Sequence, residues 1–160
     1  TLEAIDILKV LKNETDAPID LMERALLLAG ELIELSGKVE KGKGTETAKE
    51  VLTSGKAYEK FLAICKAQGR FSKPVLAPYK IEIRAEKSGI LKRIDNRKIA
   101  KLAKLSGAPQ SKSAGILLNV HLNDKIEKDD LLYTLFAESQ GELNYAIEYK
   151  NSHNDIITIK

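Results

Sequence analysis

The feature of this sequence that most constrains its fold is a change in the spacing of apolar residues near the middle of the chain. Before Gly69 apolar residues recur every three or four positions, which is the period of an amphipathic helix. After Pro78 they alternate with charged residues, which is the period of a strand with one buried face. The sequence therefore predicts an α+β fold, with a helical segment at 1–74 followed by a β-rich domain at 75–160. The proline-containing stretch 70–78 is the predicted linker.

Four helices are expected in the first segment. The second should begin at Asp20, with Glu23 completing a capping box, and end at Gly37. It is so apolar that we expect it to be buried on more than one side. Its main apolar face is predicted to consist of Leu21, Ala25, Leu28, Leu32 and Leu35. The other three helices are predicted over residues 1–12, about 46–53, and 54–69.

The second segment is expected to combine strands with two helices. Asp95 can cap a helix over 96–105 with its side chain. The connection 122–132 contains Asn123, Asp124, Asp129 and Asp130, at positions where turns need a positive φ or a side-chain acceptor. Strands are predicted over 79–85, 90–94, 115–122, 131–137 and 156–159, and the second helix over 139–150.

Composition narrows the class of protein. Hydrophobic residues make up 43% and charged residues 31% of the chain, which is typical of a globular protein rather than a disordered one. The net charge is +3, but basic and acidic residues are mixed along the chain, so we expect no nucleic-acid partner. No apolar stretch is long enough for a membrane span, so no membrane partner is expected either. A single cysteine allows no internal disulfide, which fits a reducing cytoplasm.

Few residues offer obvious chemistry. Cys65 lies in a predicted helix without an activating histidine nearby, which favours a structural thiol. His121 and His153 are isolated and lack metal-ligand spacing. Residues 38–44 are a predicted loop, and its lysine–glycine run 41–44 lacks the flanking strand and the Lys-Ser/Thr pair of a P-loop. The sequence thus assigns no catalytic, metal-binding or cofactor-binding residue, and no cofactor is expected.

Several short motifs nevertheless follow one another in a distinctive order. They are Gly89, Ile94-Asp95-Asn96, Gly107-Ala108-Pro109, Lys112, Ala114-Gly115-Ile116, Ile126, Leu132 and Ala137-Glu138. Their order and spacing resemble the C-terminal domain of the thymidine phosphorylase family, in the branch of archaeal AMP phosphorylases and type 2 thymidine phosphorylases. The stretches 2–9, 53–61 and 67–69 resemble the same family, so the resemblance covers nearly the whole chain. The family usually has glycine at positions 123 and 129, and Asn and Asp are the residues that best replace it there.

The resemblance implies a barrel-sandwich-like domain (an α/β-hammerhead) and a pentosyl transfer. Phosphate would attack the anomeric carbon of thymidine and release thymine and 2-deoxyribose 1-phosphate. The groups that hold phosphate and base lie, in this family, N-terminal to the segment that Thr1 matches. The chain is therefore expected to be a piece of a longer, cytoplasmic enzyme of nucleoside salvage, inactive alone. A nucleotide substrate, AMP or CMP, and a processed start at Thr1 remain alternatives.

Two kinds of partner follow from the same resemblance. The N-terminal catalytic domain should dock on the chain, and the family suggests a homo-oligomer. If the chain is a piece, its helical half should expose an apolar face, most clearly at 21–35.

One loop could contribute to an active site. Residues 106–113 include Gly107, Ser111, Lys112 and Ser113, which combine flexibility with donors suited to an anion. The matching loop of related phosphorylases could help to close the active-site cleft. The alternative interpretation is a solvated connector.

A carrier function is the main competing interpretation. The stretch 85–135 resembles the shape of biotinyl and lipoyl domains, which carry a modifiable lysine at a hairpin tip, usually beside methionine. Lys125 and Lys128 lie in a turn, but Met22 is far away in sequence. We therefore interpret this similarity as one of shape.

Overall fold

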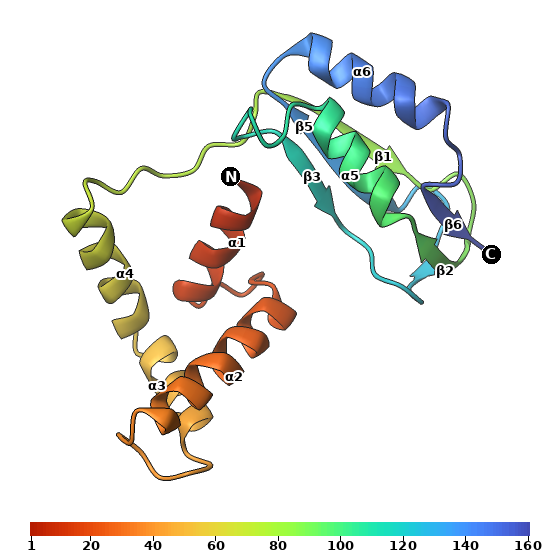
Figure 1. Ribbon diagram of the computed structural model, residues 1–160. Coiled ribbons are helices and arrows are strands. Elements are labelled where there is room, and N and C mark those ends of the chain that lie inside the picture. The colour runs from red at the N-terminus through yellow and green to blue at the C-terminus, as the bar shows by residue number, and fades with distance from the viewer. The chain divides into compact units, whose positions relative to one another are not determined.

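The computed structural model describes residues 1–160 and divides them into two compact units. One unit is Glu3–Lys73, and the other is Pro74–Lys160 together with Thr1–Leu2. Helices and antiparallel sheets are both present, which confirms the α+β class (Figure 1).

The first unit is built from helices. They are α1 (Leu2–Leu11), α2 (Ile19–Leu35), α3 (Gly44–Thr53) and α4 (Lys56–Ala67). The capping box predicted for α2 is wrong, because the helix begins one residue before Asp20 and its N-cap is Pro18. Proline fixes φ at a value suited to a helix start, so no side-chain cap is needed to begin the turn. Asp20 instead lies in the first turn, where its negative charge favours the helix N-terminus.

Helix α2 packs against α3 through glycines. A Cβ atom on Gly44 would lie 2.1 Å from the carbonyl oxygen of Gly30, and one on Gly30 would lie 2.5 Å from the backbone nitrogen of Thr45. The opposite, leucine-rich face is open: Leu28, Leu32 and Leu35 are 59%, 67% and 82% exposed. Within this chain, α2 is therefore covered on one side only, rather than on more than one as its composition suggested.

The second unit contains two three-stranded antiparallel sheets. Their orders are β1-β5-β3 and β4-β2-β6. Strand β5 is central in the first sheet and pairs on both edges, which explains why six of its seven residues are buried. The strands are β1 (Tyr79–Arg84), β2 (Gly89–Ile94), β3 (Gly115–Leu118), β4 (Lys125–Ile126), β5 (Leu131–Ala137) and β6 (Ile157–Ile159).

Two strand predictions need correction. The strand predicted over 115–122 ends at Leu118, because the chain leaves the sheet for a turn that begins near His121. The two-residue strand β4 lies inside the connection 122–132 and was not predicted. It pairs only at Gly89 and Ile90 and is too short to show a period of its own.

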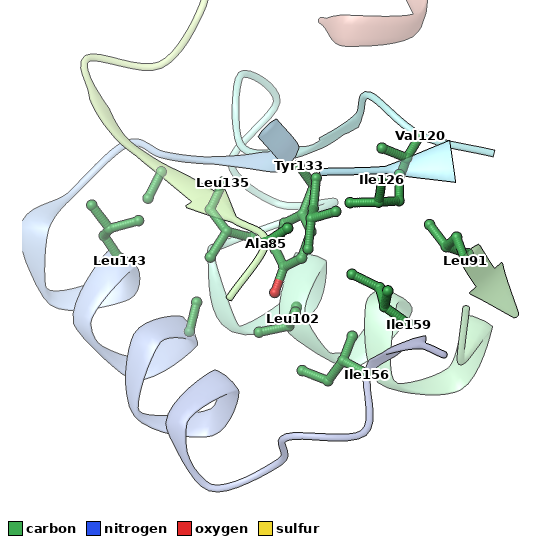
Figure 2. Packing of buried hydrophobic residues seen from close by; sticks show 13 residues of the cluster. Ala85, Leu91, Leu102, Val120, Ile126, Tyr133, Leu135, Leu143, Ile156 and Ile159 are labelled. Atoms are coloured by element: carbon green, nitrogen blue, oxygen red, sulfur yellow. The ribbon is translucent and has the colours of Figure 1, made fainter. Parts of the chain in front are cut away.

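Helices α5 (Asn96–Leu105) and α6 (Gln140–Asn151) lie next to each other beside the first sheet (Figure 1). The predicted cap of α5 is confirmed, since the Asp95 carboxylate accepts hydrogen bonds from the backbone N–H groups of Arg97 and Lys98. Ser139 caps α6 in the same way. The space between helices and sheets is filled by one apolar cluster, in which Leu91, Leu102 and Leu135 are fully buried (Figure 2).

The connection 122–132 contains two turns of the same design. Asn123 and Asp129 have φ values of 74° and 73°, which confirms the positive φ predicted from their residue types. The residue after each of them uses its carboxylate as an acceptor, so Asp124 and Asp130 fasten the turns to the N–H groups of His121 and Glu127, each at 2.7 Å.

Candidate functional site

The loop 106–113 leaves the end of α5 and returns toward α6. Gly107 has a φ of 112°, and the peptide bond between Ala108 and Pro109 is cis. The Ser111 hydroxyl donates a hydrogen bond of 3.2 Å to Oε1 of Glu142 in the first turn of α6. A Cβ atom on Gly107 would lie 2.8 Å from that same oxygen. The glycine therefore lets the loop backbone approach the glutamate closely.

A second carboxylate holds the far end of the loop. The backbone N–H and the hydroxyl of Ser113 donate to Oε1 of Glu138, at 3.0 and 2.8 Å. These two hydrogen bonds lower the pKa of Glu138, because they favour the charged form of the carboxylate. Ser113 is thus fastened by an ionised side chain of the segment that follows β5.

The structure places the four loop residues as follows. Gly107, Ser111 and Ser113 contact the carboxylates of Glu138 and Glu142, while Lys112 is exposed. In this conformation the hydroxyl donors serve carboxylates of the chain itself. An incoming anion would have to replace Glu138 or Glu142 as their acceptor, which requires the loop to move.

The residues with inherent reactivity are not brought together. Cys65 is a free, half-buried thiol in α4. The side chain of His121 is 84% exposed and lies 3.8 Å from Asp124. His153 stacks on Tyr149, with ring centroids 4.0 Å apart. No group of three or more His, Cys, Asp and Glu side chains could hold a metal ion.

The lysine–glycine loop 41–44 already has an internal acceptor. Glu34 of α2 receives a hydrogen bond of 2.8 Å from the backbone N–H of Gly44, at the start of α3. Hydrogen bonds from Gly42 and Gly44 lower the pKa of Glu34. A carboxylate of the chain thus takes the position at which a phosphate would bind a helix N-terminus.

A cavity of about 350 Å³ opens in the second unit, beside the end of β1. Its walls include the segment after β1 and the connection between α6 and β6, which are far apart in sequence. Sequence reasoning missed this cavity, because its residues form no local motif.

None of the helices is both long and apolar enough to cross a membrane.

Comparison with known proteins gives a consistent result. Residues 90–156 match the family described as "Pyrimidine nucleoside phosphorylase C-terminal domain". The chain is 49% identical over 159 residues to a protein of Legionella pneumophila (strain Corby) named "Putative thymidine phosphorylase". Proteins of the same name from Hahella chejuensis and Parvibaculum lavamentivorans are each 46% identical over 159 residues.

These similarities cover 99% of this chain but only 31–32% of the three relatives. The chain therefore spans about a third of the length of the curated relatives it matches. The resemblance drawn from the motifs at residues 81–138 is confirmed.

Proposed function

We propose, from this relationship to the thymidine phosphorylase family, that the chain is the C-terminal accessory part of an enzyme that cleaves thymidine with phosphate. The products would be thymine and 2-deoxyribose 1-phosphate, in nucleoside salvage in the cytoplasm. The reacting groups would lie in the region of the relatives that this chain does not cover. The observation that carries the proposal is the identity of 46–49% along practically the whole chain.

The chemistry of the chain supports an accessory role. A phosphorylase needs amides, hydroxyls and a lysine around phosphate, together with partners for the charge that develops on sugar and base. The serine hydroxyls of loop 106–113 and the amide of Gly44 serve internal carboxylates instead. The chain by itself therefore lacks a ready phosphate cradle at either place.

The two units would have different tasks. Residues 1–74 would belong to the catalytic region as a helical segment, and 75–160 would form the C-terminal pyrimidine nucleoside phosphorylase-type domain. The paired turns at Asn123 and Asp129, with two three-stranded sheets that both contribute to one apolar cluster, support a barrel-sandwich-like architecture for the second.

The exposed face of α2 would dock on the rest of the enzyme. Leu28, Leu32 and Leu35 lie at helical spacing on one side and remain open in this chain. The part of the relatives that this chain does not cover would supply the partner for this face. The family also suggests that the whole enzyme is a homo-oligomer.

The loop 106–113 would act as a lid. Releasing Ser111 from Glu142 and Ser113 from Glu138 would free two hydroxyls and leave the exposed Lys112 able to turn toward an anion. Closure over phosphate and nucleoside would exclude water from the reaction.

The proposal is tested by phosphorolysis. The 160-residue chain, incubated with thymidine and phosphate, should release no thymine, whereas the full-length protein should release it. The same assay with CMP and AMP separates the nucleoside from the nucleotide alternative. A full-length protein that cleaves none of these substrates would refute the assignment.

A lid function makes a separate demand on the full-length enzyme. Lys112→Gln should raise KM for phosphate, whereas Lys101→Gln, which removes a similar exposed charge from α5, should not. If the two variants have the same KM for phosphate, the loop is a connector and not a lid.

The carrier alternative has a direct test. Mass spectrometry of the purified chain would reveal a biotinyl or lipoyl adduct on Lys125 or Lys128. Lys125 already forms an ion pair of 3.7 Å with Glu127, and Met22 belongs to the other unit, so the usual lysine–methionine arrangement is missing. We expect no adduct.

A further inference from the structure

The cavity beside β1 combines an apolar wall with a cationic one. Isoleucines of β1 and β6 and Leu132 form the apolar side. Arg84, Lys87 and Lys150 provide three positive charges, and Glu86 is the one carboxylate of the lining. A volume of about 350 Å³ lies in the range of pockets that take small organic ligands.

The cations differ in how far they are already neutralised. Arg84 is held by Glu82 and by the carbonyl oxygen of Asp129, so its position is fixed. Lys150 approaches Glu86 only to 3.9 Å, which is a loose ion pair. Lys87 takes part in no ion pair. The cavity thus keeps positive charge that side chains of the chain do not fully offset.

Tyr133 is a further polar residue in the wall of this cavity. Tyr133 of β5 is 2% exposed, lines the cavity and makes no hydrogen bond through its hydroxyl. No polar side-chain atom of the chain is sealed from solvent without a partner, so this hydroxyl keeps some contact with solvent. Figure 2 shows its oxygen directed away from β5 toward the layer of side chains that contains Leu102. A hydroxyl that keeps contact with solvent and has no partner in the chain is available to donate to a ligand atom.

The helix end near the cavity does not oppose an anion strongly. The final carbonyls of α6 would contribute partial negative charge. Three of them already accept hydrogen bonds: Glu148 from Ser152, Tyr149 from the Nδ1 position of His153, and Lys150 from the N–H of His153. Because a carbonyl can only accept, Nδ1 of His153 carries a proton, and Nε2 remains for other partners.

We propose that this cavity binds a small organic anion, in which a phosphate or carboxylate meets Lys87 and Lys150 and an apolar body covers Tyr133 and the isoleucines. The Tyr133 hydroxyl donates to the ligand, and Arg84 forms a fixed part of the wall. The site lies wholly within the second unit. It requires neither phosphorolysis nor any part of the relatives outside this chain, so its failure and that of the proposed function are distinguishable.

The test is a titration of the isotope-labelled 160-residue chain by two-dimensional NMR. Phenyl phosphate is the first probe, because it joins a phosphate to a flat apolar body. We expect saturable shifts of the amides of Lys87, Tyr133 and His153. Benzoate tests whether a carboxylate serves equally well. Inorganic phosphate lacks the apolar ring and phenol lacks the phosphate, so each should bind at least about fivefold more weakly than phenyl phosphate.

Three variants assign the contacts. Tyr133→Phe removes only the hydroxyl and should weaken phenyl phosphate about three- to tenfold, as expected for one hydrogen bond. Lys87→Gln should weaken it by a similar factor. Lys101→Gln, on the exposed surface of α5, is the matched control and should leave affinity unchanged.

Two outcomes would overturn the site. The first is no saturable shift around the cavity at about 20 mM probe, which corresponds to a binding free energy weaker than about −2.3 kcal/mol. The second is equal weakening by Lys87→Gln and Lys101→Gln, which would indicate diffuse attraction to a basic surface. Spectra that retain the dispersion of the parent chain ensure that either result concerns binding and not unfolding.

Discussion

At the scale of single residues, the twin turns show how side chains replace glycine at strained positions. The backbone of each turn is tied by the same pair of hydrogen bonds to one residue, which lies in strand β2 for the first turn and directly after strand β1 for the second. Asn123 and Asp124 exchange them with Leu91, and Asp129 and Asp130 exchange them with Ala85. Asn123 and Asp129 are six residues apart, and so are their partners Leu91 and Ala85, so the same arrangement occurs twice within one domain.

These turns lead to a prediction about residue type. Asp129 is exposed and has a φ of 73°, so its side chain contributes little packing and its backbone conformation dominates. Asp129→Gly should change the free energy of unfolding by less than about 1 kcal/mol, since glycine adopts this region freely. Asp129→Val should destabilise the chain by about 2 kcal/mol, because a β-branched residue is strongly disfavoured there. Urea unfolding followed by circular dichroism would measure both, and equal effects would contradict the argument.

Tyr133 leads to a prediction about alkaline pH. Burial raises the pKa of its hydroxyl from 10.0 to about 12. Between these values the unfolded chain loses the proton and the folded chain keeps it, so stability must fall as pH rises. The contribution is fully present below about pH 10 and amounts to about 2 kcal/mol of unfolding free energy, lost by about pH 12.

The matched variant for this prediction is Tyr133→Phe. At neutral pH it should stay within about 0.5 kcal/mol of the parent, because no hydrogen bond within the chain is lost. Urea unfolding at about pH 9 and about pH 11.5 should show a smaller loss of stability in the variant. All other ionisable groups are common to both proteins, so the difference between them isolates the tyrosine. An identical alkaline loss would place the titration elsewhere.

At the scale of elements, the contact between α2 and α3 depends on the absence of side chains. Gly44→Ala would place a carbon 2.1 Å from the Gly30 carbonyl oxygen, a backbone atom that cannot move alone. The two helices would have to separate, and we expect a loss of at least about 2 kcal/mol. Gly141→Ala in α6 meets nothing within 4 Å and should be neutral or stabilising by about 0.5–1 kcal/mol. Thermal unfolding would compare them, and similar melting temperatures would show that the helices are not closely packed.

The elements also show which sequence signals are local enough to be reliable. Asp95 and Ser139 act on N–H groups two or three residues away, so residue type alone predicts the starts of α5 and α6. The N-cap of α2 was predicted two residues too late, at Asp20 rather than Pro18, because aspartate is a favoured N-cap and proline also suits a helix start. Strand β4 is defined by its pairing with Gly89 and Ile90, and no local pattern marks two residues.

At the scale of the whole molecule, what could be predicted from the sequence depends on how far apart the contributing residues are. The α+β class follows from periods that repeat within about ten residues. The cavity unites Arg84, Tyr133 and Lys150, which come from separate elements and carry no common motif. Likewise, the hydrogen-bond donors of the loop 106–113 could be recognised from the sequence. Their acceptors, Glu138 and Glu142, could not be predicted, because only the folding of the chain brings them near the loop.

The exposed leucines of α2 lead to the last prediction, which concerns association. A soluble monomer rarely leaves a contiguous apolar helix face open. Leu28, Leu32 and Leu35 are all more than half exposed, and their spacing places them on one side of α2. Without the polypeptide that we propose to cover this face, the 160-residue chain should self-associate at high concentration and bind a hydrophobic dye.

Sedimentation of the double variant Leu28→Ser, Leu32→Ser should show a clear shift toward monomer, with the helix still formed because both positions are exposed. The control Ile64→Ser changes an exposed apolar residue of α4 and should leave association unchanged. A parent chain that sediments as a monomer and binds no dye would mean that this face needs no cover, and the docking proposal would then lose its physical basis, whatever the phosphorolysis assay shows.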